Sequence, residues 1–211
     1  MRPFVFILVA IAVTAAACNS GSSDSSAEQQ RGPTQETTPQ PTVSGHHFTK
    51  SELAHIVLQP SDAPPGMRYT RRESGPKTLD DLGFVLKADL KEINSLRIRG
   101  IRDVIFDSSN GRSRLSSRAW LFAQPKGASA WLEKSRNDAI NFALEPLDSP
   151  SLADASWAAR GSLTGVNVLT YAFRSENVVV TVSMLAPEST AATDSTALAA
   201  AHRAVDRLQA S

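Results

Sequence analysis

One stretch near the end of the chain, residues 178–185, limits the fold more than any other. Its first part reads Val-Val-Val-Thr-Val, so apolar side chains occur at successive positions. Successive side chains of a β-strand point to opposite faces of a sheet, and this run therefore presents apolar groups on both faces. Both faces then need cover from other elements. The run predicts a central strand in a sheet with elements packed on each side.

Two β-hairpins are predicted, and this strand belongs to the second of them. Strands are expected at residues 104–106, 112–122, 157–162, 166–173 and 178–185. Asn110-Gly111 lies between the first two, and Asn-Gly is a strong signal for a tight turn between antiparallel strands. The polar segment Arg174 to Asn177 joins the last two strands. The sheet is therefore expected to be antiparallel.

Helical patterns occupy the segments around the hairpins. Helices are predicted at residues 49–59, 78–94, 125–143 and 193–209. Thr49 with Glu52, and Thr78 with Asp81, have the spacing of a capping box, in which each side chain bonds the backbone amide of the other residue. The third helix is expected to bury Ala128, Trp131, Leu132, Ala139 and Phe142. The order of elements predicts an α+β fold, with an antiparallel β-sheet built from hairpins and helices packed on it as an α/β sandwich.

The N-terminal segment has the features of an export signal. Arg2 supplies a positive charge, and residues 4–17 form an uncharged run of 14 residues. A membrane-spanning helix needs about 20 apolar residues, whereas the apolar region of a signal peptide has about 7–15. Residues 1–17 are therefore expected to be a signal peptide, and the mature protein is expected to lie outside the cytoplasm.

The only cysteine, Cys18, follows the small residues Ala15-Ala16-Ala17. This segment resembles a bacterial lipoprotein signal, in which Leu and two small residues precede a cysteine whose thiol receives diacylglycerol. Ala15 stands where Leu is commonest in that signal. The resemblance implies cleavage before Cys18, lipidation of Cys18 and a stable anchor in the cell membrane. The alternative is an ordinary secretory signal that leaves a free cysteine.

The segment after the leader has little capacity to fold. In residues 19–45, 20 of the 27 are Ser, Thr, Gln, Pro or Gly. Such a composition buries too little apolar surface to offset the entropy lost on ordering. Residues 18–47 are therefore expected to be a disordered tether in which His46 and His47 are solvated, and residues 48–211 to be a single globular domain.

The charge of the chain is balanced, with 22 Lys and Arg against 21 Asp and Glu. This balance gives no general attraction to nucleic acid, which an exported protein is not expected to bind. Residues 68–118 differ, with 12 basic against 7 acidic residues. They predict either a solvated polar face or a patch that binds an anionic envelope polymer, lipid headgroups or an acidic protein partner. The patch would consist of Arg97, Arg99, Arg102, Arg112, Arg114 and Arg118.

Two other kinds of site are considered. An open apolar groove for a ligand could be lined by Trp120, Trp157 and Tyr171. The alternative function, a cell-envelope hydrolase or transferase, would use His55 or His202 with an acid that the sequence does not reveal. The sequence contains no His-Glu-x-x-His, Gly-x-Ser-x-Gly or phosphate-loop motif and no second cysteine. No catalytic residue, metal or cofactor is therefore expected.

Four short motifs give the folded part a family resemblance: Pro60–Gly66, Phe122–Trp131, Asp154–Trp157, and Phe173-Arg174 leading into Asn177–Val180. With these motifs the chain resembles uncharacterised lipoproteins of high-GC Gram-positive bacteria. In outline it is also similar to extracellular sensor domains of mycobacterial receptor kinases and to Mog1/PsbP-like lipoproteins. These resemblances imply an α+β sandwich and a role in the cell envelope, and they transfer no catalytic residue. The expected function is a membrane-anchored, non-enzymatic domain that binds a ligand or partner.

Overall fold

The computed structural model describes residues 46–82, 87–148, 151–163, 165–187 and 191–211. The predicted signal peptide, Cys18 and all of the predicted tether except His46 and His47 lie outside the described residues. In the part of the chain that the structure describes, no helix is long and apolar enough to cross a membrane.

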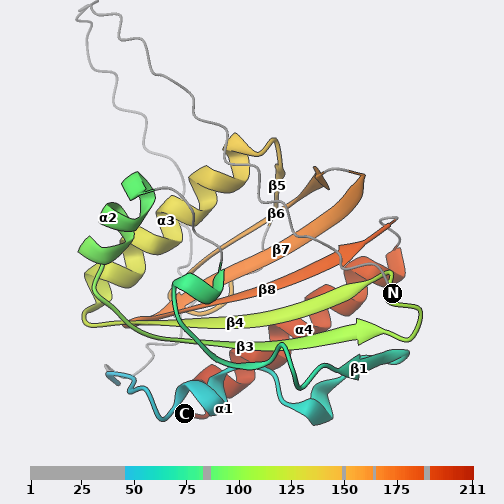
Figure 1. Ribbon diagram of the computed structural model, residues 1–211, viewed down its shortest axis with the longest axis horizontal. Helices are drawn as coiled ribbons and strands as arrows, with labels where there is room; N and C mark the ends of the chain where they lie inside the picture. Colours follow the sequence, from blue (N-terminus) through green and yellow to red (C-terminus); the bar gives the residue numbers. More distant parts are fainter. Residues whose placement is uncertain (1–45, 83–86, 149–150, 164, 188–190) are drawn as a thin grey trace, which may run out of the picture. The chain divides into compact units, whose positions relative to one another are not determined.

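An antiparallel β-sheet forms the centre of the fold (Figure 1). The strands are β1 (Met67–Tyr69), β2 (Gly75–Lys77), β3 (Ile98–Ser108), β4 (Arg114–Phe122), β5 (Glu145–Leu147), β6 (Ala155–Leu163), β7 (Val166–Ser175) and β8 (Val178–Ala186). They lie in the order β1-β3-β4-β8-β7-β6-β5, and β2 also pairs with β3. The predicted α+β fold is confirmed, and β8 lies centrally, between β4 and β7.

Helices pack on both faces of this sheet. The helical elements are α1 (Leu53–Ile56), η1 (Pro60–Asp62), η2 (Asp80–Leu82), α2 (Lys87–Ser95), α3 (Pro125–Asn141) and α4 (Ala191–Gln209). Helix α4 packs on β7 and β8 and also contacts α1, which packs on β3 and β4. Helix α3 packs on the other side, against β4, β7 and β8 (Figure 1). We call the two sides of the sheet the α4 face and the α3 face.

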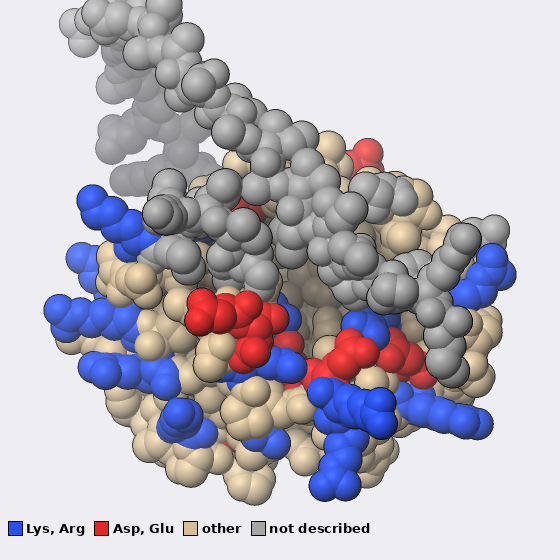
Figure 2. Space-filling model, in the orientation of Figure 1, with Lys and Arg blue, Asp and Glu red and all other residues tan. Residues whose placement is uncertain are grey.

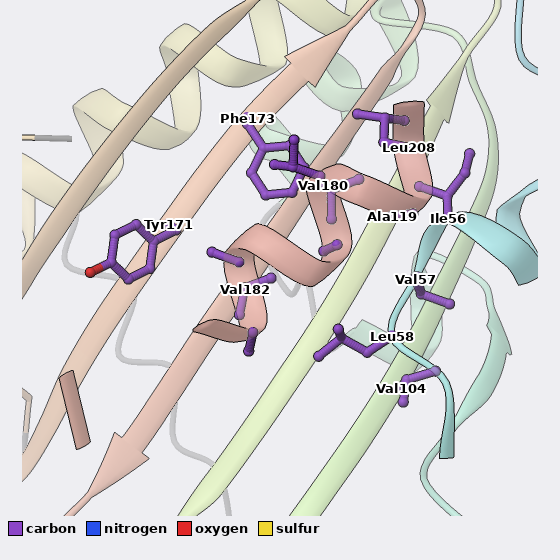
Figure 3. Packing of buried hydrophobic residues seen from close by; sticks show 14 of the residues in the cluster. Ile56, Val57, Leu58, Val104, Ala119, Tyr171, Phe173, Val180, Val182 and Leu208 are labelled. Atoms are coloured by element: carbon purple, nitrogen blue, oxygen red, sulfur yellow. The ribbon is translucent and has the colours of Figure 1, made fainter. Parts of the chain in front are cut away.

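The larger hydrophobic core lies on the α4 face (Figure 3). Val178, Val180 and Val182 are alternate residues of β8, and all three are completely buried there. They pack with residues of β7 such as Phe173 and with the inner side of α4, including Leu208. Burial of this apolar surface is the main source of stability in such a layer.

The core on the α3 face is smaller. The ring centroids of Trp120 and Trp131 lie 4.4 Å apart, and Phe122 and Val179 belong to the same cluster. Both faces of the first half of β8 are thus covered, as its sequence predicts. Trp120 and Val179 lie directly opposite each other on neighbouring strands. Beyond Trp120 and Val179, the next residues of β4 and β8 on this face are polar.

Several predicted elements differ from those observed. The helix predicted at 49–59 is the short α1, which begins at Leu53 with Glu52 as its N-cap and ends where the chain becomes extended at Val57 (ψ 160°). The helix predicted at 78–94 is η2 followed by α2, and residues 83–86 between them lie outside the described residues. Phe142, predicted to be buried, is 37% exposed because α3 ends at Asn141. The short strands β1, β2 and β5 were not predicted.

The capping box predicted at Thr78 and Asp81 is present. The Thr78 amide donates to Asp81 Oδ2 over 2.7 Å, and the Asp81 amide donates to Thr78 Oγ1 over 3.3 Å. The box predicted at Thr49 and Glu52 forms only in part: the Thr49 amide and hydroxyl donate to the Glu52 carboxylate, but the Glu52 amide bonds the carbonyl oxygen of Thr49 and not its hydroxyl. These bonds stabilise the ionised carboxylates, and they lower the pKa of both Glu52 and Asp81.

The Glu52 carboxylate also accepts a bond from outside the predicted box. His46 Nε2 lies 2.7 Å from Glu52 Oε1, and His47 Nε2 lies 3.4 Å from Asn177 Nδ2. The prediction of two solvated tether histidines is therefore wrong in part. Although exposed, both side chains contact the folded unit, because Phe48 beside them is buried in it.

We expect Glu52 to make stability depend on pH in the acidic range. Its hydrogen bonds to Thr49, and then to His46, lower its pKa in the folded state. Its contribution is therefore present above the pKa of the unfolded chain, about 4.5, and is lost as the pH falls through the folded value. Urea unfolding should show the wild type to be more stable than Glu52→Gln at pH 6, with a smaller difference at pH 3. An equal difference at both pH values would contradict this assignment.

Candidate functional site

Beyond α3, the α3 face of the sheet changes from apolar to polar. Side chains alternate between faces, so every second residue along β4 from Trp120, and along β8 from Val179, lies on this face. The next two such residues are polar in both strands. Neighbouring residues of β3 and β7 extend the polar area. We call the whole set the polar strip, and it consists of Asp103, Ser116, Arg118, Thr170, Thr181 and Ser183.

The first row of the strip is centred on an ion pair. Arg118 on β4 lies opposite Asp103 on β3 and opposite Thr181 on β8. Arg118 Nε donates to Asp103 Oδ1 over 2.6 Å, and Arg118 Nη2 donates to Asp103 Oδ2 over 2.7 Å. Such bidentate pairing fixes the plane of the guanidinium. The guanidinium carbon also lies 5.6 Å from the ring centroid of Trp120, which adds a cation–π contact.

The second row of the strip consists of hydroxyl groups. Ser183 on β8 lies opposite Ser116 on β4 and opposite Thr170 on β7. The hydroxyl oxygens of Thr170 and Ser183 are 3.0 Å apart and share a hydrogen bond. The Ser116 hydroxyl lies 3.5 Å from the carbonyl oxygen of Ser183. Three hydroxyl groups therefore lie side by side across three strands.

The strip is partly open to solvent. Ser116, Thr181 and Ser183 are half-buried, whereas Thr170 is buried. The side chain of Arg118 is 34% exposed, and that of Asp103 is 3% exposed. On the face of the molecule shown in Figure 2, acidic and basic side chains lie next to one another. This arrangement suits non-covalent recognition, because fixed donors and acceptors lie at a surface that a small molecule can reach.

The structure does not bring the six predicted arginines together. Arg97 lies just before β3, and Arg112 lies in the turn after it. With 11 residues in β3, its two ends are about 35 Å apart. Arg102 has the opposite parity to Asp103 and therefore faces the α4 side, where its buried Nε has no hydrogen-bond partner among the described residues. Arg99 is exposed near the start of β3.

Arg114 differs from Arg118 although both lie on β4. Arg114 Nε and Nη2 donate to Asp107, and its Nη1 donates to Glu73 Oε2 over 2.6 Å. Two carboxylates therefore surround one guanidinium, so the charge of Arg114 is more than balanced locally. Of the six predicted residues, Arg118 alone lies in the polar strip.

The predicted apolar groove does not form as a single surface. Trp120 is 2% exposed and lies against Trp131 on the α3 face. Trp157 lies on the same face, where its indole Nε1 donates to Ser135 Oγ over 3.3 Å. Tyr171 belongs to the core on the α4 face. Strand alternation therefore separates Tyr171 from the two tryptophans.

A second candidate surface lies at the far edge of the sheet. A cavity of about 240 Å³ there is lined by residues of α3, β5 and β6, including Arg136, Ile140, Leu147 and Trp157. Ile140 is 46% exposed. With Phe142, it is one of the two large apolar side chains exposed within the described residues. The sequence did not indicate this surface, because Phe142 fits the apolar stripe of α3 and was therefore expected to be buried.

The histidines considered for catalysis do not approach the polar strip. His55 and His202 are exposed on α1 and α4, two helices that cover the opposite face of the sheet. Among the described residues, no group of three or more His, Cys, Asp or Glu side chains could hold a metal ion.

Comparison with solved structures identifies a similar fold. The extracellular domain of PknH from Mycobacterium tuberculosis matches with a TM-score of 0.57 and 14% sequence identity. The match covers 80% of this chain and 100% of the PknH chain. At this identity the similarity shows the fold alone. No protein-family model matches the chain, and no curated protein matches it either.

Proposed function

We propose that this protein is a non-enzymatic binding domain outside the cytoplasm, held at the membrane through lipidated Cys18, and that the polar strip is its ligand site. The observation that carries the proposal is the ion pair of Asp103 and Arg118. It places a buried carboxylate and a half-exposed guanidinium in the middle of a sheet. Hydroxyl groups of two further strands surround it.

Polar side chains are unusual on this face of the central strands. Its residues on β4 and β8 continue a face that is apolar next to α3, where Trp120 and Val179 are buried. Polar groups placed in such a layer lose hydration and must find partners, whereas apolar residues would extend the core. A polar surface at that place is therefore better explained by recognition than by stability.

The fold and the leader support the same proposal. The similar PknH domain is extracellular, and residues 1–18 resemble a lipoprotein signal. A hydrolase or transferase finds less support, since the strip contains no histidine or cysteine that could act as base or nucleophile. His55 and His202, which that alternative would use, lie on helices of the opposite face.

Photo-crosslinking in the cells that produce the protein tests the proposed site. A benzophenone amino acid at Thr181, in the strip, should capture a ligand or partner several-fold more efficiently than the same group at Arg203. Arg203 is exposed on α4, on the opposite side of the sheet. Both variants should first be shown to fold and to reach the same cell fraction. Equal capture at the two positions would show that the strip is not the binding site.

A further inference from the structure

The two charges of the ion pair in the strip lie at different depths below the surface. The carboxylate of Asp103 is 3% exposed, whereas the guanidinium side chain of Arg118 is 34% exposed. The pair is neutral in total, but its negative end lies deeper than its positive end. The surface of the strip therefore presents the positive end of a fixed dipole. A group with a small negative charge suits such a surface better than a cation does.

One edge of the Arg118 guanidinium remains available. Asp103 occupies Nε and Nη2, and Nη1 has no hydrogen-bond partner among the described residues. In Arg114 the corresponding Nη1 is taken by Glu73. A guanidinium held along one edge by a carboxylate can bind a second planar carboxylate along the next edge, through Nη1 and the remaining proton of Nη2.

Hydroxyl-bearing residues are neighbours of Arg118 in the sheet. Thr181 is opposite Arg118 on the neighbouring strand, and Ser116 is two residues away on the same face of β4. Thr170 and Ser183 share one hydrogen bond, so one hydroxyl proton of that pair is free for another acceptor. These groups both donate and accept, which matches the hydroxyl groups of a polyol.

We propose that the polar strip binds a small hydroxylated carboxylate, of the size of a sugar acid, with its carboxylate on Arg118 and its hydroxyl groups on Ser116, Thr181 and Ser183. This inference rests on the proposed function of the same site. A dianion suits the strip less well, because Asp103 already balances the charge of Arg118. A purely neutral sugar suits it less well too, because the nearest indole, Trp120, is buried and offers no face for stacking.

The test is a calorimetric titration of the full mature chain with three matched probes. Glucuronate carries one carboxylate, glucose carries none, and glucose 6-phosphate carries a phosphate in the equivalent place. We expect glucuronate to bind at least about tenfold more tightly than glucose, as for a charge-assisted bidentate hydrogen bond. We also expect it to bind more tightly than glucose 6-phosphate. Glucose equal to glucuronate, a preference for the phosphate, or binding of none of the three would overturn the inference.

Variants locate the binding. Removal of Arg118 alone would leave Asp103 buried without its partner and could unfold the chain. The double variant Asp103→Asn/Arg118→Gln avoids an unpaired charge and should remove the preference for glucuronate over glucose. Arg114→Gln on the same strand should keep that preference. Retention of the preference in the double variant, or its loss in the Arg114 variant, would contradict the assignment of the carboxylate to Arg118.

A second pair of substitutions leaves the ion pair intact. Ser116→Ala/Thr181→Val removes two hydroxyl groups and should weaken glucuronate binding about tenfold or more, with little change in the melting temperature. Unchanged affinity would contradict the assigned hydroxyl contacts. The inference and the proposed function fail separately. Capture at Thr181 without any preference for carboxylate would overturn the ligand class while leaving the strip as the binding site.

Discussion

Asn177→Ala should cost about 3–4 kcal/mol in the free energy of unfolding, because it removes three buried hydrogen bonds at once. The Phe48 amide donates to Asn177 Oδ1 over 2.9 Å. Asn177 Nδ2 donates to the carbonyl oxygens of Phe48 and Phe122, each over 3.0 Å. With Asn177 only 1% exposed, water cannot easily replace these bonds.

Denaturant unfolding measures the loss, and hydrogen exchange locates it. The Phe48 amide should exchange much faster in Asn177→Ala, since its acceptor is gone. Asn137→Ala is the matched control, because Asn137 is exposed on α3 and the substitution should change stability by less than about 0.5 kcal/mol. A loss of less than 1 kcal/mol in Asn177→Ala would show that the Phe48 segment is held by packing instead.

Cys18→Ser should move nearly all of the protein from the membrane fraction to the soluble fraction. Two or more acyl chains hold a protein stably on a bilayer, and Cys18 is the only residue of the chain that can receive them through a thiol. The measurement is fractionation of cells followed by quantification of the protein in the membrane pellet.

Ser22→Ala, a few residues into the predicted tether, is the matched control and should stay with the membrane. Metabolic labelling with a radioactive fatty acid should mark the wild type and the control but not Cys18→Ser. Cys18→Ser protein that is exported and still sediments with membranes would exclude lipidation as the anchor.

The apolar patterns of the sequence predicted the central part of the fold well. The run from Val178 to Val182 predicted a central strand with cover on both sides, and β8 has that position. The apolar stripe of α3 was also correct at Trp131 and Leu132. In these segments the burial of large side chains decides the structure, and such burial leaves a periodic pattern in the sequence.

The shortest strands left no such pattern. The strands β1 and β2 are three residues long, polar in part, and defined by pairing with β3. The helix predicted from Thr49 begins only at Leu53, with Glu52 as its N-cap, and ends at Ile56, so the capping motif fixed neither end of the helix. Phe142 fitted a helical stripe, but the chain leaves α3 at that residue and turns through Ala143 at φ 57°.

The polar strip was missed because the first strand was predicted only at residues 104–106, which leaves out Asp103, and because no local signal shows that β4 pairs with β8. The sequence predicts a tight turn at Asn110-Gly111, but the Ser108 amide bonds the carbonyl oxygen of Ser113, so the loop is longer than a two-residue turn. The longer loop keeps the register of that turn, in which paired residues lie symmetrically about Asn110-Gly111, so Asp103 lies opposite Arg118 as the predicted turn implies. Alternation of polar residues along β4, back from Trp120, and the register of the predicted turn were the local signals for the site.

Amide chemical shifts of the isotope-labelled mature protein, recorded with a panel of small neutral sugars, sugar acids and amides, test most directly whether the strip is a binding site. The shifts should change at Ser116, Arg118, Thr181 and Ser183 and should leave the cavity beside Ile140 and Leu147 unaffected. Changes confined to that cavity, or spread evenly over the surface, would show that the polar strip does not bind ligands.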